Sequence, residues 1–448
     1  MTVFRANAVW IDGKIATNID IHVGANGYID AIHPPADAVR DEILELPGVV
    51  YPGFANAHSH AFHRALRGRT HGDGGTFWTW RQGMYQAATT LTPDTYYGLA
   101  RAVYGEMVLA GVTSVGEFHY VHHDTDGTSY SDSNAMGHAL ISAARDAGLR
   151  ITLLDTCYLA GGLDQSGHLA LMPEQLRFSD GSVEAWADRV SSLSDSHGVR
   201  IGAAIHSVRA VPRDSISKVA AFSSTQPLHI HVSEQPAENQ ACLDAYGCTP
   251  TELLHSSGAL SPRTTAVHAT HLTPNDIALL GNTRTFSCFC PTTERDLADG
   301  IGPATALASA GSRLCLGSDQ HAVIDLLEEA RALEMHERLE TNQRGRIQPM
   351  EIVTALTTAG HESLGWNDVG RIAVGQRADL VAIRTDTVRT AGSDPAQIAL
   401  SAFAADVDTV VVDGVVRVSG GRHMSIDVAS ELVDTISGLW SQVDLERR

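Results

Sequence analysis

The middle of the chain alternates short apolar segments with helical patterns, and this alternation restricts the possible folds more than any other feature. Helical patterns such as those of residues 95–110 and 133–147 separate several of the apolar segments. Strands that alternate with helices form parallel sheets, because each parallel connection needs a crossover. Eight such units predict an α/β fold of the (β/α)8 barrel type, like a TIM barrel, rather than an open doubly wound sheet. The expected strands span residues 49–56, 112–118, 150–157, 200–206, 227–232, 264–268, 284–289 and 313–317.

The two ends of the chain have a different pattern. Both contain short alternating strands, with turn signals at Asp12-Gly13 and Asp413-Gly414. Asp-Gly between apolar strands is typical of a β-hairpin. We therefore expect residues 1–50 and 371–448 to build one small β-sandwich domain, with an amphipathic helix at about 428–445. Residues 51–370 would form the catalytic barrel domain.

Composition and charge limit the partners and the compartment. The chain has 448 residues and a formal net charge of −20, which argues against a nucleic-acid partner because phosphate binding needs basic patches. The sequence has neither a signal-peptide pattern nor an apolar run long enough for a membrane span. Its six cysteines lack C-x-x-C spacing, so no disulfide framework is indicated. We expect a cytoplasmic protein without a membrane partner.

Metal-competent and charged side chains follow most of the expected strands. Barrel enzymes place their chemistry at the carboxyl ends of the strands, so this pattern predicts a catalytic site there. The candidates are His58 and His60 after the first strand, Glu117, His119 and Tyr120 at the second, His206 and Arg209 after the fourth, His231 and Glu234 at the fifth, His268 at the sixth and Asp319 after the eighth.

His58 and His60 are the clearest part of this set. Residues i and i+2 of a strand point to the same side, so both imidazoles can reach one point. Imidazole is a common ligand of divalent metals. Three histidines and one aspartate with an open position are typical of a catalytic metal site, in which the ion lowers the pKa of a bound water toward about 7. A nearby glutamate and histidine could then move protons.

Several residues have simpler interpretations. A single histidine at a strand end usually makes a structural hydrogen bond. His229 has the same strand parity as His231, so the pattern does not choose between them, although His231 lies nearer the loop end. Cys288 and Cys290 are expected to pack in the interior. The strand-end argument assigns no site to His63, His71, His122, His123, His255 and His271.

The expected site holds one metal. A second metal in this kind of barrel usually needs a carboxylated lysine at the fourth strand. The fourth strand here ends in His206, and Lys218 lies further along in a helical stretch.

Several short motifs of the chain resemble those of a known superfamily. They are Pro52-Gly-Phe54, His58-Ser-His60, His231, His268, Gly317-Ser-Asp319 and the segment 370–381. Together they resemble the amidohydrolase superfamily over nearly the whole chain.

Longer motifs are similar to those of one family within it, the formimidoylglutamate deiminases. This family hydrolyses N-formimino-L-glutamate to N-formyl-L-glutamate and ammonia in histidine degradation. The motifs are Phe77-Trp-Thr-Trp-Arg81, Glu117-Phe-His-Tyr120, His206-Ser-Val-Arg209, His231-Val-Ser-Glu-Gln235 and the segment 290–297.

The resemblance implies a homodimer with one zinc ion per chain and a role for each matching residue. His63 stands where some members have glutamine, at a position expected to contact the substrate. The implied zinc ligands are His58, His60, His231 and Asp319; the proton-handling residues are Glu234, His268 and Asp319; the substrate contacts are His63, Arg81, Tyr120, His206 and Arg209.

The residues agree with a small dicarboxylate substrate, since Arg81 and Arg209 can each bind a carboxylate. The main alternative is a related deaminase acting on guanine, cytosine or an adenosine derivative, which would favour aromatic walls and amide groups. A non-catalytic scaffold or a zinc carrier is a further alternative. The complete set of candidate ligands and proton-handling residues argues against both.

Overall fold

A parallel eight-stranded barrel forms the larger part of the fold, in a computed structural model that describes residues 2–35, 42–72, 75 and 77–446. Neighbouring strands pair in chain order, which confirms the predicted (β/α)8 barrel. The strands are β5 (Phe54–Ser59), β6 (Val112–His119), β7 (Arg150–Cys157), β10 (Val199–Ile205), β11 (Leu228–Val232), β12 (Thr264–His268), β13 (Phe286–Phe289) and β14 (Arg313–Leu316).

The barrel closes between β14 and β5, at the segments that carry the expected metal ligands. The backbone N–H groups of Ser318 and Asp319 donate to the carbonyl of His58 at 3.1 and 3.0 Å. The N–H of His60 donates back to the carbonyl of Asp319 at 3.2 Å. A side chain at Gly317 would place a Cβ 2.7 Å from that of His58, so glycine allows this close approach. Closure therefore brings His58, His60 and Asp319 together.

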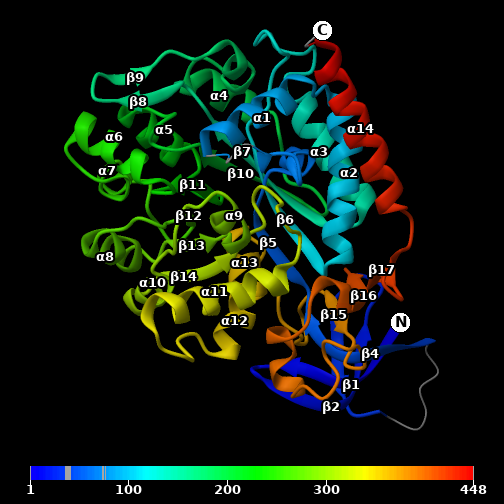
Figure 1. Cartoon of the computed structure of the whole chain (residues 1–448). Helices are drawn as coiled ribbons and strands as arrows, with labels where there is room; N and C mark the ends of the chain where they lie inside the picture. The colour runs from blue at the N-terminus through cyan, green and yellow to red at the C-terminus, as the bar shows by residue number, and fades with distance from the viewer. Residues whose placement is uncertain (1, 36–41, 73–74, 76, 447–448) are drawn as a thin grey trace.

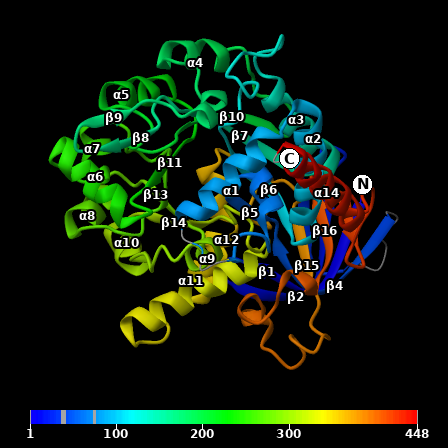
Figure 2. The ribbon, with the colours of Figure 1, turned by 45° about the horizontal axis from the view of Figure 1, so that its top comes forward.

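Helices surround the barrel and cover its outer face (Figures 1 and 2). The first crossover helix begins after Thr92, whose side chain accepts from the N–H of Thr95, with Pro93 at the first helical position. The surrounding helices are α2 (Pro93–Leu109), α3 (Ala135–Ala147), α4 (Val183–Val190), α5 (Arg213–Phe222), α6 (Pro236–Tyr246), α7 (Pro250–Ser256), α8 (Pro274–Asn282), α10 (Ala304–Ala310), α11 (Leu326–Thr341), α12 (Pro349–Leu356) and α13 (Thr358–Ser363).

Further elements follow the carboxyl ends of the barrel strands. They are the 3-10 helices η1 (Ala61–Leu66) and η3 (Pro173–Phe178), the helices α1 (Phe77–Thr89) and α9 (Pro291–Asp296), and the hairpin β8 (Gly162–Asp164) with β9 (Gly167–Leu169).

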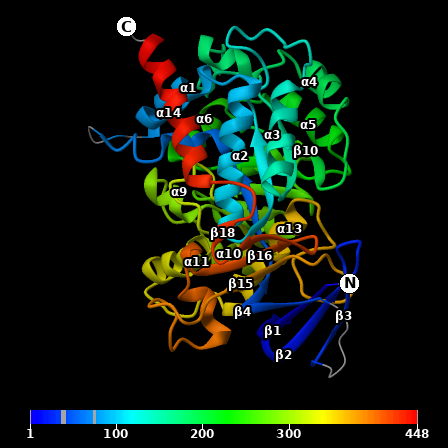
Figure 3. The same cartoon turned by 90° about the vertical axis from the view of Figure 1, so that its right-hand side faces the viewer.

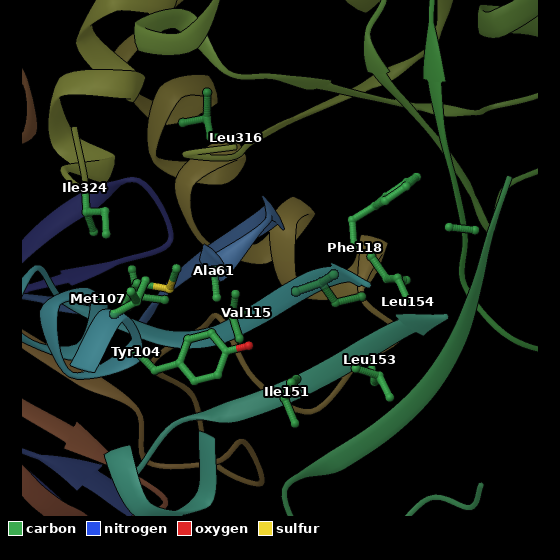
Figure 4. Packing of buried hydrophobic residues seen from close by; sticks show 14 of the residues in the cluster. Ala61, Tyr104, Met107, Val115, Phe118, Ile151, Leu153, Leu154, Leu316 and Ile324 are labelled. Atoms are coloured by element: carbon green, nitrogen blue, oxygen red, sulfur yellow. The ribbon is translucent and has the colours of Figure 1, made fainter. Parts of the chain in front are cut away.

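The buried core joins the barrel to its helices. Figure 4 shows Tyr104 and Met107 of α2 close to Val115 of β6 and Ile151 of β7, and all four are fully buried. Large apolar side chains between a helix layer and a parallel sheet stabilise the strands whose ends carry the site.

The two ends of the chain form one eight-stranded mixed sheet beside the barrel, as expected for a domain built from both termini (Figures 1 and 3). Strand β4 joins the two halves, parallel to β1 and antiparallel to β15. The domain limits at residues 51 and 371 stay a prediction. The sheet consists of β1 (Thr2–Ile11), β2 (Lys14–Val23), β3 (Ile29–His33), β4 (Glu42–Pro52), β15 (Leu380–Ile383), β16 (Val407–Val412), β17 (Val415–Ser419) and β18 (Arg422–His423).

The expected first barrel strand, residues 49–56, is wrong in its limits. The structure divides this run at Gly53, between β4 of the mixed sheet and β5 of the barrel. The Gly53 N–H donates to Asp379 at 2.9 Å, and a Cβ there would lie 2.3 Å from the Thr113 hydroxyl oxygen. Both halves of the run are buried and apolar, so hydropathy alone does not show the division.

The C-terminal helix α14 (Val428–Glu446) confirms the expected helix at 428–445 and packs along α2 (Figures 1 and 3). The Trp440 indole N–H donates to the carbonyl of Ala65 in η1 at 2.9 Å. This helix therefore supports the turn that follows the first metal-ligand candidates. Among the helices of the described residues, none has both the length and the apolar character to cross a bilayer.

Candidate metal centre and catalytic cavity

Four donor atoms converge where the barrel closes. Asp319 Oδ1 lies 3.3 Å from His58 Nε2 and 3.4 Å from His60 Nε2. His231 Nε2 lies 3.2 Å from His58 Nε2. These side chains come from β5, the residue after β5, β11 and the loop after β14, and all are buried. The barrel thus brings together all four predicted metal ligands.

Hydrogen bonds on the far side of two rings fix which nitrogen faces the cluster. His60 Nδ1 donates to the Phe118 carbonyl at 2.8 Å, and His231 Nδ1 donates to the His206 carbonyl at 2.8 Å. A neutral imidazole that donates from Nδ1 has its lone pair on Nε2. Both Nε2 lone pairs therefore point at the cluster, as in metal-ligating histidines with a backbone acceptor behind them.

Burial keeps these rings in the form that binds metal. Desolvation lowers the pKa of His58 to about 3, against the opposing effect of the Asp319 hydrogen bond. Desolvation also lowers the pKa values of His60 and His231. Neutral imidazoles with inward lone pairs would repel one another without a cation between them. The donor set therefore fits a divalent metal.

Asp319 supplies the negative charge of the cluster. Burial by itself would raise the pKa of its carboxyl, but the hydrogen bond and charge of His58, and the charges of His268 and His60, lower it below its ordinary value. An ionised carboxylate among neutral imidazoles completes a three-histidine, one-aspartate set.

Backbone strain is concentrated at the same strand ends. Ser233, His268, Ala269, Asp319 and His321 all have positive φ angles, between 42° and 67°. Non-glycine residues rarely adopt this region, and such strain is often found at functional sites. These residues follow β11, β12 and β14, the strands that supply the site.

His268 lies beside the four donors and among carboxylates. Its Nε2 is 3.8 Å from Glu234 Oε1 and 3.9 Å from Asp319 Oδ2. Desolvation would lower the pKa of His268, but Glu234, Glu294 and Asp319 outweigh it and raise the pKa to about 10. The His268 ring also has a donor atom within 4.8 Å of donors on His58 and His231. The three predicted proton-handling residues are thus in one place.

A cavity opens onto this cluster. The structure places every predicted substrate contact on its wall: His63, Arg81, Tyr120, His206 and Arg209.

Arg209 is a charged group of this wall that lies close to one of the proton-handling residues. Its NH2 nitrogen is 3.6 Å from Glu234 Oε2, and its Nε is 3.6 Å from Glu238 Oε2. These separations exceed hydrogen-bond range, and Nε has no hydrogen-bond partner among the described residues. Despite burial, Glu238 and Glu234 raise the pKa of Arg209, so its guanidinium stays charged.

His63 and Tyr120 form a polar pair on the same wall. His63 Nε2 and the Tyr120 hydroxyl are 2.8 Å apart, and the His63 ring lies edge-on to Trp80 with centroids 5.1 Å apart. His63 belongs to η1, the turn after β5. For that reason a search of the strand ends does not identify His63, whereas the family resemblance includes it as a substrate contact.

Sequence reasoning assigned no role to Glu238, which lines an adjoining cavity together with Arg209. Glu238 is buried on α6, four positions after Glu234, and its carboxyl oxygens have no hydrogen-bond partner among the described residues. The i, i+4 spacing of two glutamates beside a strand end was an available signal. The apolar and aromatic part of the wall consists of Phe77, Trp80, Met84, Tyr85, Tyr158, Phe178 and Leu297.

The remaining candidates of the sequence pattern lie outside the cavity. His229 Nε2 contacts the Ser363 carbonyl at 3.1 Å, whereas His231 contacts His58. Cys288 and Cys290 are buried in an apolar cluster with Val267 and are free thiols, as expected for packing. Lys218 is exposed and pairs with a surface glutamate, so it is not at the site.

Glu117 and His119 were strand-end candidates that are also absent from the cavity wall. Glu117 accepts from the Ser59 hydroxyl and the Ala61 N–H, each at 2.7 Å, and so supports the segment between His58 and His60.

Comparisons with known proteins agree with this geometry. The sequence profile of the amidohydrolase family matches residues 49–417. The chain belongs to the amidohydrolase family. It is 36% identical to a formimidoylglutamate deiminase of Pseudomonas aeruginosa, over 96% of this chain and 99% of that protein. It is 29% identical to an 8-oxoguanine deaminase of the same organism, over 96% of this chain and 95% of that protein.

Solved structures show the same fold. An amidohydrolase from Brucella melitensis has a TM-score of 0.90 and 30% identity, over 98% of this chain and all of that chain (100%). An adenosine deaminase from Xanthomonas campestris with bound zinc has a TM-score of 0.83 and 21% identity, over 99% of this chain and 98% of that chain.

Proposed function

We propose that this chain is a metal-dependent hydrolase that converts N-formimino-L-glutamate and water to N-formyl-L-glutamate and ammonia. The proposal rests mainly on Arg209, a largely buried guanidinium whose Nε makes no hydrogen bond to the described residues. Arg209 and Arg81 line the same cavity as the metal cluster. Arginine binds carboxylates in a bidentate manner. A substrate with two carboxylates matches two arginines.

His58, His60, His231 and Asp319 would hold one zinc ion. The ion would supply Lewis acidity, which lowers the pKa of a water molecule toward about 7. His206 at the end of the fourth strand leaves no lysine there for a second ion. Zinc is favoured by the histidine-rich donor set.

The chain's own residues would move the protons. His268 and Asp319 would accept or guide the proton that water loses; His268 Nε2 lies 3.9 Å from Asp319 Oδ2. Glu234, 3.8 Å from His268, would donate a proton to the substrate nitrogen that leaves as ammonia. The formimino carbon thereby exchanges its double bond to that nitrogen for a carbonyl, and both protons of the water leave with the nitrogen as ammonia.

The other wall residues would bind and orient the substrate. Arg209 and Arg81 would each bind a carboxylate, and Tyr120, His206 and His63 would donate or accept hydrogen bonds along the substrate. The homodimer implied by the family resemblance and the cytoplasmic location expected from the composition stay predictions.

One observation favours a second candidate, deamination of a purine. Aromatic side chains form much of the cavity wall, including Phe77, Trp80, Tyr85, Tyr158 and Phe178. Flat aromatic bases stack well on such walls. The arginine pair favours the dicarboxylate, because a neutral base offers no carboxylate for either guanidinium to bind.

An ammonia-release assay separates the two. The zinc-loaded protein is assayed with N-formimino-L-glutamate, 8-oxoguanine, guanine, cytosine and adenosine. We expect release from N-formimino-L-glutamate with a kcat/KM at least about 100-fold above any base, since loss of two charge-assisted contacts costs about 3 kcal/mol or more. Release from a base and none from N-formimino-L-glutamate would reject the proposal.

A further inference from the structure

The segment 290–297 contributes one buried acid to the catalytic region that the reaction above does not use. Glu294 lies in the first turn of α9, two per cent exposed. Its Oε1 accepts from the backbone N–H of Cys290 at 2.8 Å. The same oxygen lies 3.5 Å from His268 Nδ1.

His268 has carboxyl groups on both sides of its ring. Its Nε2 faces Glu234 and Asp319 on the cavity side, at 3.8 and 3.9 Å. Its Nδ1 is buried and has no partner within hydrogen-bond criteria among the described residues. The Glu294 carboxyl lies 3.5 Å from this nitrogen. Catalytic hydrogen bonds are often long in an unloaded site and shorten when the site is loaded.

His268 differs from two of the metal-ligand candidates in the group that lies behind its Nδ1. His60 and His231 each have a neutral backbone carbonyl behind Nδ1, whereas His268 has a carboxyl group. A carboxylate behind an imidazole orients the ring and stabilises its protonated form more than a carbonyl does. The group behind His268 is thus suited to fix the orientation of this ring.

Glu294 is well placed to fix an orientation because its own position is fixed. Its backbone N–H donates to the Cys290 carbonyl at 3.0 Å, and its carbonyl accepts from Asp299 at 2.9 Å. The neighbouring Thr292 N–H donates to buried Glu329 at 2.8 Å. His268 and Ala269 have positive φ angles of 67° and 50°, so the strand end itself is strained and needs outside support.

We propose that Glu294 is the positioning residue of His268: it accepts from Nδ1–H and holds Nε2 toward Glu234, Asp319 and the cavity. The inference rests on the proposed function, since it assumes that His268 moves a proton. Glu294 does not line the cavity and so acts through His268.

The test is a double-mutant cycle in the zinc-loaded protein. Glu294→Gln should lower kcat about 10- to 100-fold, the usual effect of losing an outer-shell carboxylate, with KM changed by less than about threefold. In a His268→Ala background the same substitution should have no further effect, within about twofold. A similar fractional loss in both backgrounds would overturn the inference, because Glu294 would then act independently of His268.

Glu329→Gln is the matched control. Glu329 is equally buried and anchors the same segment through Thr292, but it lies outside the cavity wall. We expect it to lower the melting temperature and to change kcat by a similar factor with or without His268. If Glu329→Gln shows the same dependence on His268, Glu294 has a general structural role and the inference fails.

A crystal structure of the zinc-loaded wild type gives a readout that needs neither turnover nor a stable variant. We expect a His268 Nδ1 to Glu294 Oε distance of about 2.6–3.2 Å. A distance well beyond 3.5 Å, or a ring turned so that Nδ1 faces the cavity, would overturn the inference. Absence of ammonia release by the wild type rejects the proposed function instead, which keeps the two failures distinct.

Discussion

The catalytic region and the region around Arg189 contain similar side chains in different arrangements. Each has buried histidines beside an aspartate and an arginine between two acids. The first is built on His58, His60, His231, Asp319 and Arg209; the second is built on His119, His122, Asp155, Asp180 and Arg189.

The two regions differ in which atoms are already bonded. Asp155 accepts from two Arg189 nitrogens at 2.8 Å and from the Trp186 indole at 3.0 Å. His122 Nε2 contacts the Thr156 carbonyl at 2.9 Å and is 3.8 Å from Asp155. In the catalytic region, the donor atoms face one another instead.

The arginines differ in the same way. Arg189 makes hydrogen bonds of 2.8–3.0 Å to Asp155 and Asp180, whereas Arg209 is 3.6 Å from each of its two glutamates. A saturated cluster stabilises the fold, and an unsaturated one can bind a ligand. Residue type and burial are alike in both regions, so donor availability is what distinguishes them.

Asp319→Asn should have the largest effect on function. It removes the charged ligand, so we expect zinc content to fall below half of the wild-type value and kcat/KM to fall by about 1,000-fold or more. Elemental analysis and the ammonia assay measure both. Asp155→Asn is the matched control and should retain zinc. Equal zinc loss in both variants would contradict the inference that only the first region binds the metal.

Arg189→Met should have the largest effect on stability. It leaves Asp155 and Asp180 buried with less compensation, at a cost of about 3–5 kcal/mol in the free energy of unfolding. Urea denaturation measures this cost, and zinc content should not change. A loss below about 1 kcal/mol would show that the second cluster is not a structural ion-pair network.

The loss of unfolding free energy caused by Arg189→Met should depend on pH. Although burial opposes it, Arg189 and the nearby histidines lower the pKa values of Asp155 and Asp180 below their ordinary value. Their contribution to stability is present above the unfolded pKa of about 3.9 and is lost as the pH falls through the folded values. The difference between wild type and Arg189→Met should therefore be fully present at neutral pH and decrease as the pH falls below about 3.9.

Arg209→Met should affect binding and leave the fold nearly unchanged. Loss of a charge-assisted contact to a substrate carboxylate should raise KM for N-formimino-L-glutamate about 10- to 100-fold. Zinc content should stay at the wild-type level. An unchanged KM would remove Arg209 from the substrate site.

His63→Gln should have the smallest effect. A glutamine amide can replace the hydrogen bond between His63 Nε2 and the Tyr120 hydroxyl. We expect kcat/KM to change by about two- to threefold. A loss above about 30-fold would mean that the imidazole has a specific role.

The sequence predicted the barrel, the domain built from both ends and the residues that meet at the strand ends. It could do so because strand alternation and barrel closure dictate where such residues lie. Strand parity alone could not separate His229 from His231; only the position of His231 nearer the loop end favoured it, and His231 is the one that contacts His58. His63, Glu238 and Glu294 lie on turns and helices after the strands, where hydropathy has no fixed period relative to the site.

Anomalous X-ray scattering at the zinc edge, on crystals of the zinc-loaded protein, tests most directly the claim that free donors define the metal centre. We expect one strong anomalous peak among His58, His60, His231 and Asp319, and none near His119, His122 and Asp155. A peak at the second cluster, or no peak at the first, would contradict the claim.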